Sequence, residues 1–177
     1  MIVDQLTKLA TRNGMPLGES RPLLGNLVRL THVENRAAVM GMDVLPMSVL
    51  TVFSIVAVIA LAFWLRILMR DTVQPASRRL AAILPWVIGG AVGNLIDRAL
   101  FGGVTDMVDV DIPDLNLPAI SFGPIDWAGL QLERWWVFNV ADSFIFVGML
   151  LIIALSLTGH LDDQPVPAGT PDESPQA

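Results

Sequence analysis

The strongest constraint on this chain is a long run without any charged residue, from Val44 to Leu65. An α-helix rises about 1.5 Å per residue, so this run is long enough to cross the ~30 Å hydrocarbon core of a bilayer. Two further apolar stretches follow, from Leu80 to Ile96 and from about Val137 to Leu157. We therefore expect three complete transmembrane helices. The composition agrees, because 53% of the residues are hydrophobic and only 16% are charged, a balance unusual for a soluble domain.

The charges between these stretches predict their orientation. The connector from Arg66 to Arg79 carries four arginines against Asp71, and short arginine-rich connections usually lie in the cytoplasm. The loop from Ala99 to Trp136 is acidic and is therefore expected outside. Basic residues also occur before the first span, but acidic residues are mixed among them, and few of these basic residues lie next to a span. The connection charges thus favour an extracytoplasmic position for the loop 99–136.

The amino terminus has a helical pattern of its own. Apolar residues recur with helical spacing at Ile2, Val3, Leu6, Leu9 and Ala10. Because this pattern is already under way at the first residues, we expect residues 1–13 to be the remnant of a first transmembrane helix whose start is missing. Such a helix would complete a four-helix plan.

Two segments outside the spans have the alternation and turn residues of strands. They are residues 14–43, where we expect short strands, and Val110 to Gln131 within the outer loop, where we expect strands or irregular structure. The predicted fold class is therefore mainly α: a polytopic membrane helical bundle at 44–159, with a small extracytoplasmic β-rich subdomain at 14–43. The Pro-, Asp- and Gln-rich tail, residues 160–177, is expected to be disordered in the cytoplasm.

Polar side chains occur in two of the predicted spans. Asn94, Asp97 and Arg98 are spaced i, i+3, i+4 and so share one helix face, and Asn139 and Asp142 repeat the i, i+3 spacing. An ionisable group inside a membrane is costly unless it is paired or hydrated, so such residues usually line an internal site. Glycines at 89, 90 and 93 would let a neighbouring helix or a peptide backbone approach closely.

Structural roles would explain the same residues. Asp97 and Arg98 could form an ion pair at a helix end, and Asn139 with Asp142 could cap the last span, because Asn and Asp favour that position. Asp106, considered alone, is an ordinary loop acid. Spacing by itself therefore leaves both capping and catalysis open.

Several function classes lack their residues in this sequence. The chain has no cysteine, so a thiol nucleophile, a thiolate metal site and disulfides are excluded. It has neither an HExxH nor a GxSxG motif, and no basic stripe suggests nucleic acid. His32 and Glu34 could face the same side of a strand, but two ligands do not make a metal site.

Two long motifs carry a resemblance to a known family. GGAVGNLIDRALFGGVTDMVD, from Gly89 to Asp109, and WWVFNVADS, from Trp135 to Ser143, resemble the signatures of signal peptidase II, the prolipoprotein signal peptidase of aspartic peptidase family A8. Weaker blocks occur in the same order, DQLTK from Asp4 to Lys8 and RLTHVENRAAVMG from Arg29 to Gly41. The resemblance thus covers nearly the whole chain apart from the tail.

The resemblance implies an aspartic endopeptidase whose catalytic pair is Asp106 and Asp142. It would cut prolipoproteins just before their diacylglyceryl-modified cysteine, without a metal or an organic cofactor. It would be a multi-pass protein of the bacterial cytoplasmic (inner) membrane, a monomer in contact with membrane lipids, with its site near the extracytoplasmic face. The other matched residues would support the site or bind substrate: Asp4, Lys8, Asn35, Gly93, Asn94, Arg98 and Asn139.

The sequence also departs from the family pattern. Ala37 stands where the family usually has glycine after the outer strands, Met107 stands where phenylalanine is common, and residues 110–130 contain an acidic, proline-containing insertion. These departures leave two alternatives to an active peptidase: a homologue that binds lipopeptides without cleaving them, and a membrane scaffold or transporter subunit.

Overall fold

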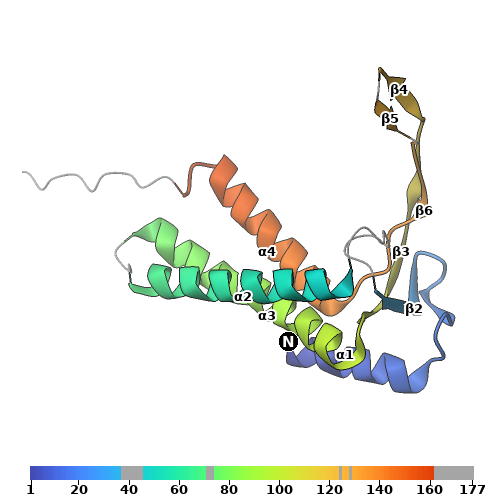
Figure 1. Ribbon diagram of the computed structural model, residues 1–177, viewed down its shortest axis with the longest axis horizontal. Helices are drawn as coiled ribbons and strands as arrows, with labels where there is room; N and C mark the ends of the chain where they lie inside the picture. Colours follow the sequence, from blue (N-terminus) through green and yellow to red (C-terminus); the bar gives the residue numbers. More distant parts are fainter. Residues whose placement is uncertain (37–45, 71–73, 124, 128, 162–177) are drawn as a thin grey trace, which may run out of the picture.

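A computed structural model describes residues 1–36, 46–70, 74–123, 125–127 and 129–161. For residues 125, 127 and 130–133 it describes the backbone but not the side chains. Long helices extend to one side of a small antiparallel sheet, which lies at one end of the helical part (Figure 1). Ala37 to Met40 and most of the predicted tail lie outside the described residues. The elements in chain order are α1 (Ile2–Gly14), β1 (Ser20–Leu24), β2 (Val28–Asn35), α2 (Met47–Arg70), α3 (Pro75–Phe101), β3 (Val104–Leu117), β4 (Ile120–Phe122), β5 (Ile125–Trp127), β6 (Leu130–Arg134) and α4 (Val140–Leu157).

The prediction of three spans is confirmed, because α2, α3 and α4 are long and apolar enough to cross a membrane. The predicted connector 66–79 is wrong in extent, since α2 continues to Arg70 and α3 already begins at Pro75. Proline is favoured in the first helical turn because its missing N–H would have no partner there. Gly102, with φ 71°, ends α3 in the left-handed conformation that a helix stop favours.

Helix α1 has its polar face inside and its apolar face outside. Ile2 and Leu6 are 72% and 60% exposed, whereas Asp4 and Lys8 are fully buried. The apolar residues that predicted this helix therefore point away from the protein. This is the expected arrangement where the surrounding medium is lipid, because lipid tails accept apolar side chains and polar side chains need partners inside.

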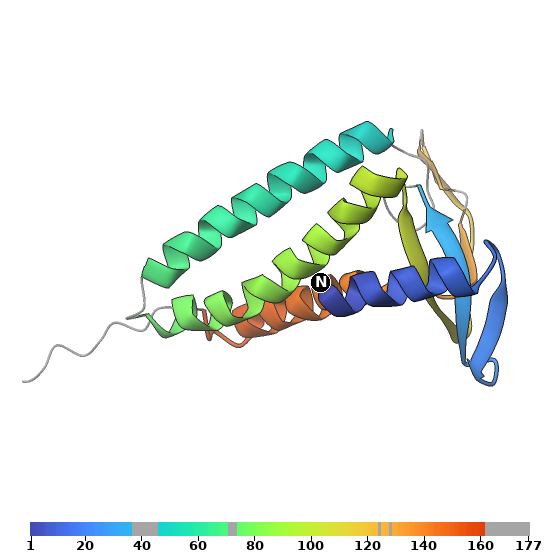
Figure 2. The same cartoon turned by 90° about the horizontal axis from the view of Figure 1, so that it is seen from below.

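The sheet has the strand order β1-β2-β3-β6. Strand β2 pairs antiparallel with the first half of β3, from Asn35 opposite Val104 to Val28 opposite Val110. The predicted strands are present in the described part of 14–43, and of the two alternatives for Val110 to Gln131, strands or irregular structure, the structure has strands. A single bridge between Val108 and Phe138 holds the chain against β3 immediately before α4 begins. Figure 2 shows the sheet across the ends of the helices, with α1 running towards it.

Glycines allow α3 and α4 to pack closely. A Cβ atom on Gly90 would lie 2.5 Å from the carbonyl oxygen of Ala141, and one on Gly93 would lie 2.6 Å from Oδ2 of Asp4. The expected close approach is confirmed at these two positions. At Gly89 no neighbouring helix approaches, because a Cβ there would meet nothing within 4 Å; approach by a peptide backbone at this position stays a prediction.

Gly90→Ala should therefore destabilise the bundle while Gly89→Ala does not. The added methyl group meets backbone at position 90, so α3 and α4 must move apart at a cost of about 1–3 kcal/mol. Thermal unfolding of both purified variants in detergent would measure the difference. Equal melting temperatures would show that this helix contact is not close in the folded protein.

Candidate active site

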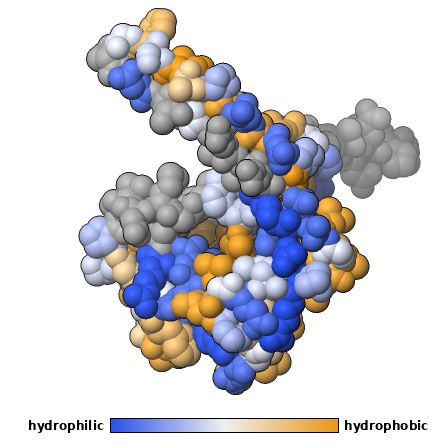
Figure 3. Space-filling model, turned by 90° about the vertical axis from the view of Figure 1, so that its right-hand side faces the viewer, coloured by the Kyte–Doolittle hydropathy of each residue, from blue (hydrophilic) through white to orange (hydrophobic). Residues whose placement is uncertain are grey.

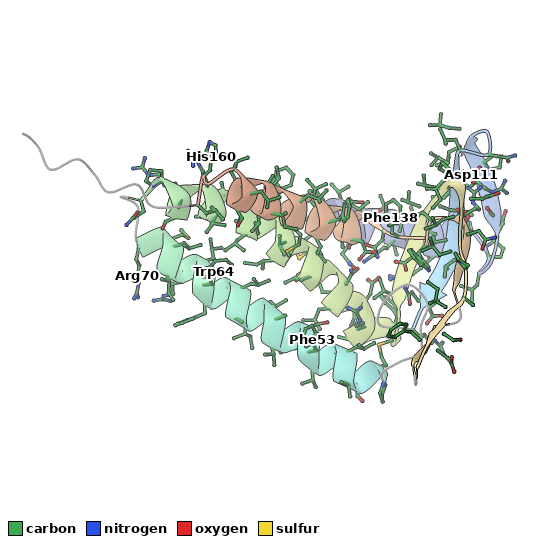
Figure 4. All side chains as sticks on the ribbon, turned by 90° about the horizontal axis from the view of Figure 1, so that it is seen from above. Phe53, Trp64, Arg70, Asp111, Phe138 and His160 are labelled. Carbon is green, nitrogen blue, oxygen red and sulfur yellow. The ribbon has the colours of Figure 1, made fainter. Side chains whose placement is uncertain are left out.

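Polar residues from four elements meet where the sheet joins the helices. Asp106 comes from β3, Asp142 from the first turn of α4, Asn94 from α3 and Asn35 from the end of β2. Figure 4 places this junction near Phe138, with Asp111 on the sheet side and with Arg70 and His160 at the opposite ends of the helices. Asp106 is only 2% exposed. The predicted pair is thus brought to one place from positions far apart in the sequence.

Asn139 connects the two aspartates. Its side-chain Nδ2 donates to Oδ1 of Asp106 at 2.6 Å, and its backbone N–H donates to Oδ2 of Asp142 at 3.2 Å. In return, its side-chain oxygen accepts the backbone N–H of Asp142 at 3.0 Å, which completes a capping box at the start of α4. The capping alternative is therefore confirmed, and the same residue also holds both carboxyl groups. The cap begins α4 at Val140, after the predicted start at Val137.

Two further amides fix the free oxygens of the pair. Asn94 Nδ2 donates to Oδ1 of Asp142 at 2.7 Å, and Asn35 Nδ2 donates to Oδ2 of Asp106 at 3.0 Å. Oδ1 of Asn94 accepts both from Asn139 Nδ2 and from the ammonium group of Lys8. Each carboxyl group is thereby held in one orientation by neutral donors.

Lys8 is a completely buried ammonium group with three acceptors. Its Nζ lies 3.0 Å from Oδ2 of Asp4, 3.2 Å from Oδ2 of Asp97 and 2.9 Å from Oδ1 of Asn94. An ammonium group has three protons to donate, so this environment satisfies it fully. Lys8 therefore joins α1 to α3, and through Asn94 it reaches Asp142.

The partners of Asp97 differ from the expected ion pair with Arg98. Asp97 lies inside α3 and pairs with Lys8 and with Arg12, whose Nη2 is 2.9 Å away. Arg98 Nη1 instead lies 3.5 Å from the hydroxyl of Ser54 on α2. The reason is helical geometry, because adjacent residues on a helix point about 100° apart and so face different neighbours.

The structure therefore places most of the predicted supporting residues in one network. Asp4 accepts the free backbone N–H of Ala141 at 2.9 Å, and Gly93 leaves the space that this carboxylate needs. Arg98 donates no hydrogen bond to the pair among the described atoms, and its buried Nε has no hydrogen-bond partner there, but its positive charge attracts both Asp142 and Asp106. Sequence reasoning missed Arg12, although it follows Lys8 at the i+4 spacing that marks one helix face.

Burial makes Asp106 a weak acid. The loss of solvation raises the pKa of Asp106 most, and the negative charge of Asp142 raises it further, to about 7. The hydrogen bonds from Asn35 and Asn139 and the charge of Lys8 lower this pKa, but by less. Near neutral pH this carboxyl group is therefore protonated about half of the time. A buried pair of carboxyl groups that shares a proton is an arrangement suited to acid–base chemistry.

The described part of the chain contains no group of three or more metal-binding side chains. His32 contacts the backbone oxygen of Met15 through Nδ1 at 2.8 Å, while Glu34 pairs with Arg36. Each of these two residues therefore has a partner of its own, His32 just after α1 and Glu34 just after β2.

Comparison with known proteins gives one consistent family. The family model described as Signal peptidase (SPase) II matches residues 1–158. The lipoprotein signal peptidase of Caldanaerobacter subterraneus subsp. tengcongensis is 34% identical over 154 residues, and that of Halothermothrix orenii is 31% identical over 153 residues; each alignment covers 86% of both chains. Two solved bacterial membrane enzymes are 26% identical, with TM-scores of 0.68 and 0.64. The first alignment covers 93% of this chain and 87% of the other, and the second covers 88% and 86%.

The raised pKa of Asp106 predicts a pH-dependent stability. In the unfolded chain this carboxyl group titrates near its ordinary value of about 4, so between about pH 4 and 7 the folded state binds more protons than the unfolded state. Stability should therefore fall as the pH rises through this range, by on the order of 4 kcal/mol at most. Asp106→Asn removes this contribution. Thermal unfolding at pH 5 and pH 8 should show a smaller pH effect in the variant than in the parent, and an equal effect would contradict the assignment.

Loss of the buried ammonium group should be strongly destabilising. Lys8→Met leaves the carboxylate of Asp4 without a cation and removes one of the two cations at Asp97, which should cost about 3–5 kcal/mol. Leu9→Met is the matched control, because Leu9 is 51% exposed on the apolar face of α1. The melting temperature of Lys8→Met in detergent should lie well below that of the control. Similar values for the two variants would contradict a paired, buried lysine.

Proposed function

This chain belongs to the signal peptidase II family, and from that premise we propose that it removes signal peptides from prolipoproteins by aspartic catalysis at Asp106 and Asp142. The chain is a multi-pass membrane protein, with apolar spans in α2, α3 and α4. The observation that carries the proposal is the double contact of Asn139, which holds two carboxyl groups from separate elements in one buried site.

The proposed mechanism uses the two carboxyl groups as one acid–base pair. Their proximity disfavours a double negative charge, so one carboxyl group keeps its proton while the other is ionised. The ionised group takes a proton from a water molecule, whose oxygen attacks the scissile carbonyl carbon. The protonated group donates a hydrogen bond to the developing oxyanion, and a proton then passes to the leaving amine as the C–N bond breaks. The reaction consumes one water molecule, and the two carboxyl groups move its protons, so the hydrolysis needs no cofactor.

The position of the pair suits a substrate that is anchored in lipid. Asp142 lies in the first turn of the membrane helix α4, and Asp106 lies on β3 just after α3 ends. The pair therefore lies near the end of the spans, where a peptide bond next to a lipid-modified cysteine could reach it while the acyl chains stay in the bilayer. We accordingly propose that cleavage occurs immediately before a diacylglyceryl-modified cysteine.

The charges at the two ends of the spans favour an extracytoplasmic site. Arg66 and Arg70 lie near the end of α2, and Arg78 and Arg79 lie near the start of α3, at the opposite end of the helices from the sheet (Figure 1). The positive-inside rule places the arginine end in the cytoplasm. The proposed setting is thus the bacterial inner membrane, with the pair towards its outer face. We also propose a monomeric enzyme, because the hydrogen bonds that hold the pair among the described residues come from one chain.

Cleavage of a diacylglyceryl-modified lipopeptide by the purified protein tests this proposal. Asp106→Asn and Asp142→Asn should each lose about 10²–10⁴-fold in rate, because each removes one half of the acid–base pair. Asp114→Asn is the matched control, since Asp114 is an exposed acid on the same strand as Asp106, and it should cleave like the parent. Mass spectrometry of the products would locate the cut.

Two results would contradict the proposal. Full activity in either pair variant would exclude aspartic catalysis by these residues. Binding of the lipopeptide by the parent without turnover, in protein whose cooperative thermal unfolding shows that it is folded, would favour a homologue that only binds.

A further inference from the structure

Strand β3 continues beyond the sheet and forms a projecting arm. Its pairing with β2 ends at Val110, and among the described residues its strand partner from Asp111 onwards is β6. Strands β4 and β5 then pair with each other at the tip. Figures 1 and 3 show this arm, residues 111–123, 125–127 and 129–134, extending away from the rest of the molecule.

The register of the arm separates apolar from polar positions. Residues directly opposite each other in an antiparallel pair share a face, and neighbours along a strand alternate between faces. The apolar pairs are Leu115 with Leu132, Leu117 with Leu130, Ile120 with Trp127 and Phe122 with Ile125. The positions between them pair Asn116 with Gln131 and Ser121 with Asp126. Each section of the arm therefore has one apolar and one polar face.

The described apolar side chains at the end of β3 and on β4 are exposed. Phe122 is 82% exposed, Ile120 is 55% exposed, and Leu115 and Leu117 are 41% and 39% exposed. A two-stranded ribbon is at best marginally stable when water surrounds it. An exposed apolar face on such a ribbon indicates that another surface covers it.

We propose that this arm is a membrane-surface anchor whose apolar face lies in the lipid–water interface beside the bundle. Figure 1 shows the arm running across the direction of α2 and α3 at the end where the sheet lies. Because α2 and α3 cross the bilayer, that direction follows the membrane surface. The arm thus lies at the level of the ends of the spans, where the proposed lipid–water interface would be.

The residues at the base of the arm and on its polar face also fit a position in the lipid–water interface. Trp135, 41% exposed, follows β6 at the base of the arm, and tryptophan is enriched at membrane–water interfaces. The exposed Asp126 shares the polar face with Ser121, so that face suits water. Because the polar face is acidic rather than basic, apolar burial must provide the attraction, and zwitterionic lipid should suffice.

The absence of native cysteine allows a label to be placed at one chosen position of the full chain. Phe122→Cys tests the apolar face, and Ser121→Cys is the matched control on the opposite face. Phe53→Cys, on the span α2 where Phe53 is 70% exposed, reports correct insertion. Each variant would carry an environment-sensitive fluorophore and would be reconstituted in phosphatidylcholine vesicles, with nitroxide-labelled lipid and aqueous iodide as the two quenchers.

The label at position 122 should emit at shorter wavelength than the label at 121 and be quenched by the nitroxide lipid, like the label at 53. The label at 121 should be quenched by iodide. Equal iodide quenching at 121 and 122 would overturn the proposal. If the label at 122 were protected from iodide quenching only when a lipopeptide is added, the proposal would also be overturned, because a polypeptide and not lipid would then cover the arm. These results do not depend on cleavage, so failure of the proposed peptidase activity would be seen separately.

Discussion

The contacts of Asn139 are the interaction on which the arrangement of the site depends. One fully buried side chain donates to Asp106, accepts from the backbone of Asp142 and thereby ends the loop and begins α4. A cap normally satisfies only the free N–H groups at the start of a helix. Here the same geometry also fixes the distance between strand β3 and helix α4. The start of the helix and the position of the carboxyl pair are therefore a single structural feature.

The second constraint comes from lipid as the surrounding medium. In water, the apolar face of α1 would turn inwards, but in this protein Asp4 and Lys8 occupy the inside and the leucines lie outside. A buried ammonium group is tolerable only when its charge is balanced, and Asp4 and Asp97 supply that balance. The same residues connect α1 to α3, and Asp4 also binds the first turn of α4. Charge neutralisation in an apolar medium thus determines how the helices are joined next to the site.

Strand β3 connects the site to the surface. Its first residues are held from several sides, since the backbone N–H of Thr105 donates to Asp97 and the Thr105 hydroxyl accepts from Arg12. Its middle residues pair with β2, and its last residues form the projecting arm. The pairing of β3 with β6 shifts register between Asp111 and Leu115, so the arm and the part of β3 that carries Asp106 are separate sections of one strand.

The sequence by itself determined the three spans, the strands that precede the first of them and, through the resemblance of two long motifs, the family. These depend on local periodicity and on ordered residue patterns, which the chain carries along its length. Only the tertiary structure decided that Asp97 pairs with α1 instead of with Arg98, that Gly90 and Gly93 but not Gly89 face a neighbour, and that the insertion projects as an amphipathic ribbon. Each of these depends on which segment lies opposite, and the distances between residues remote in sequence are set by the packing of whole elements, which no local pattern contains.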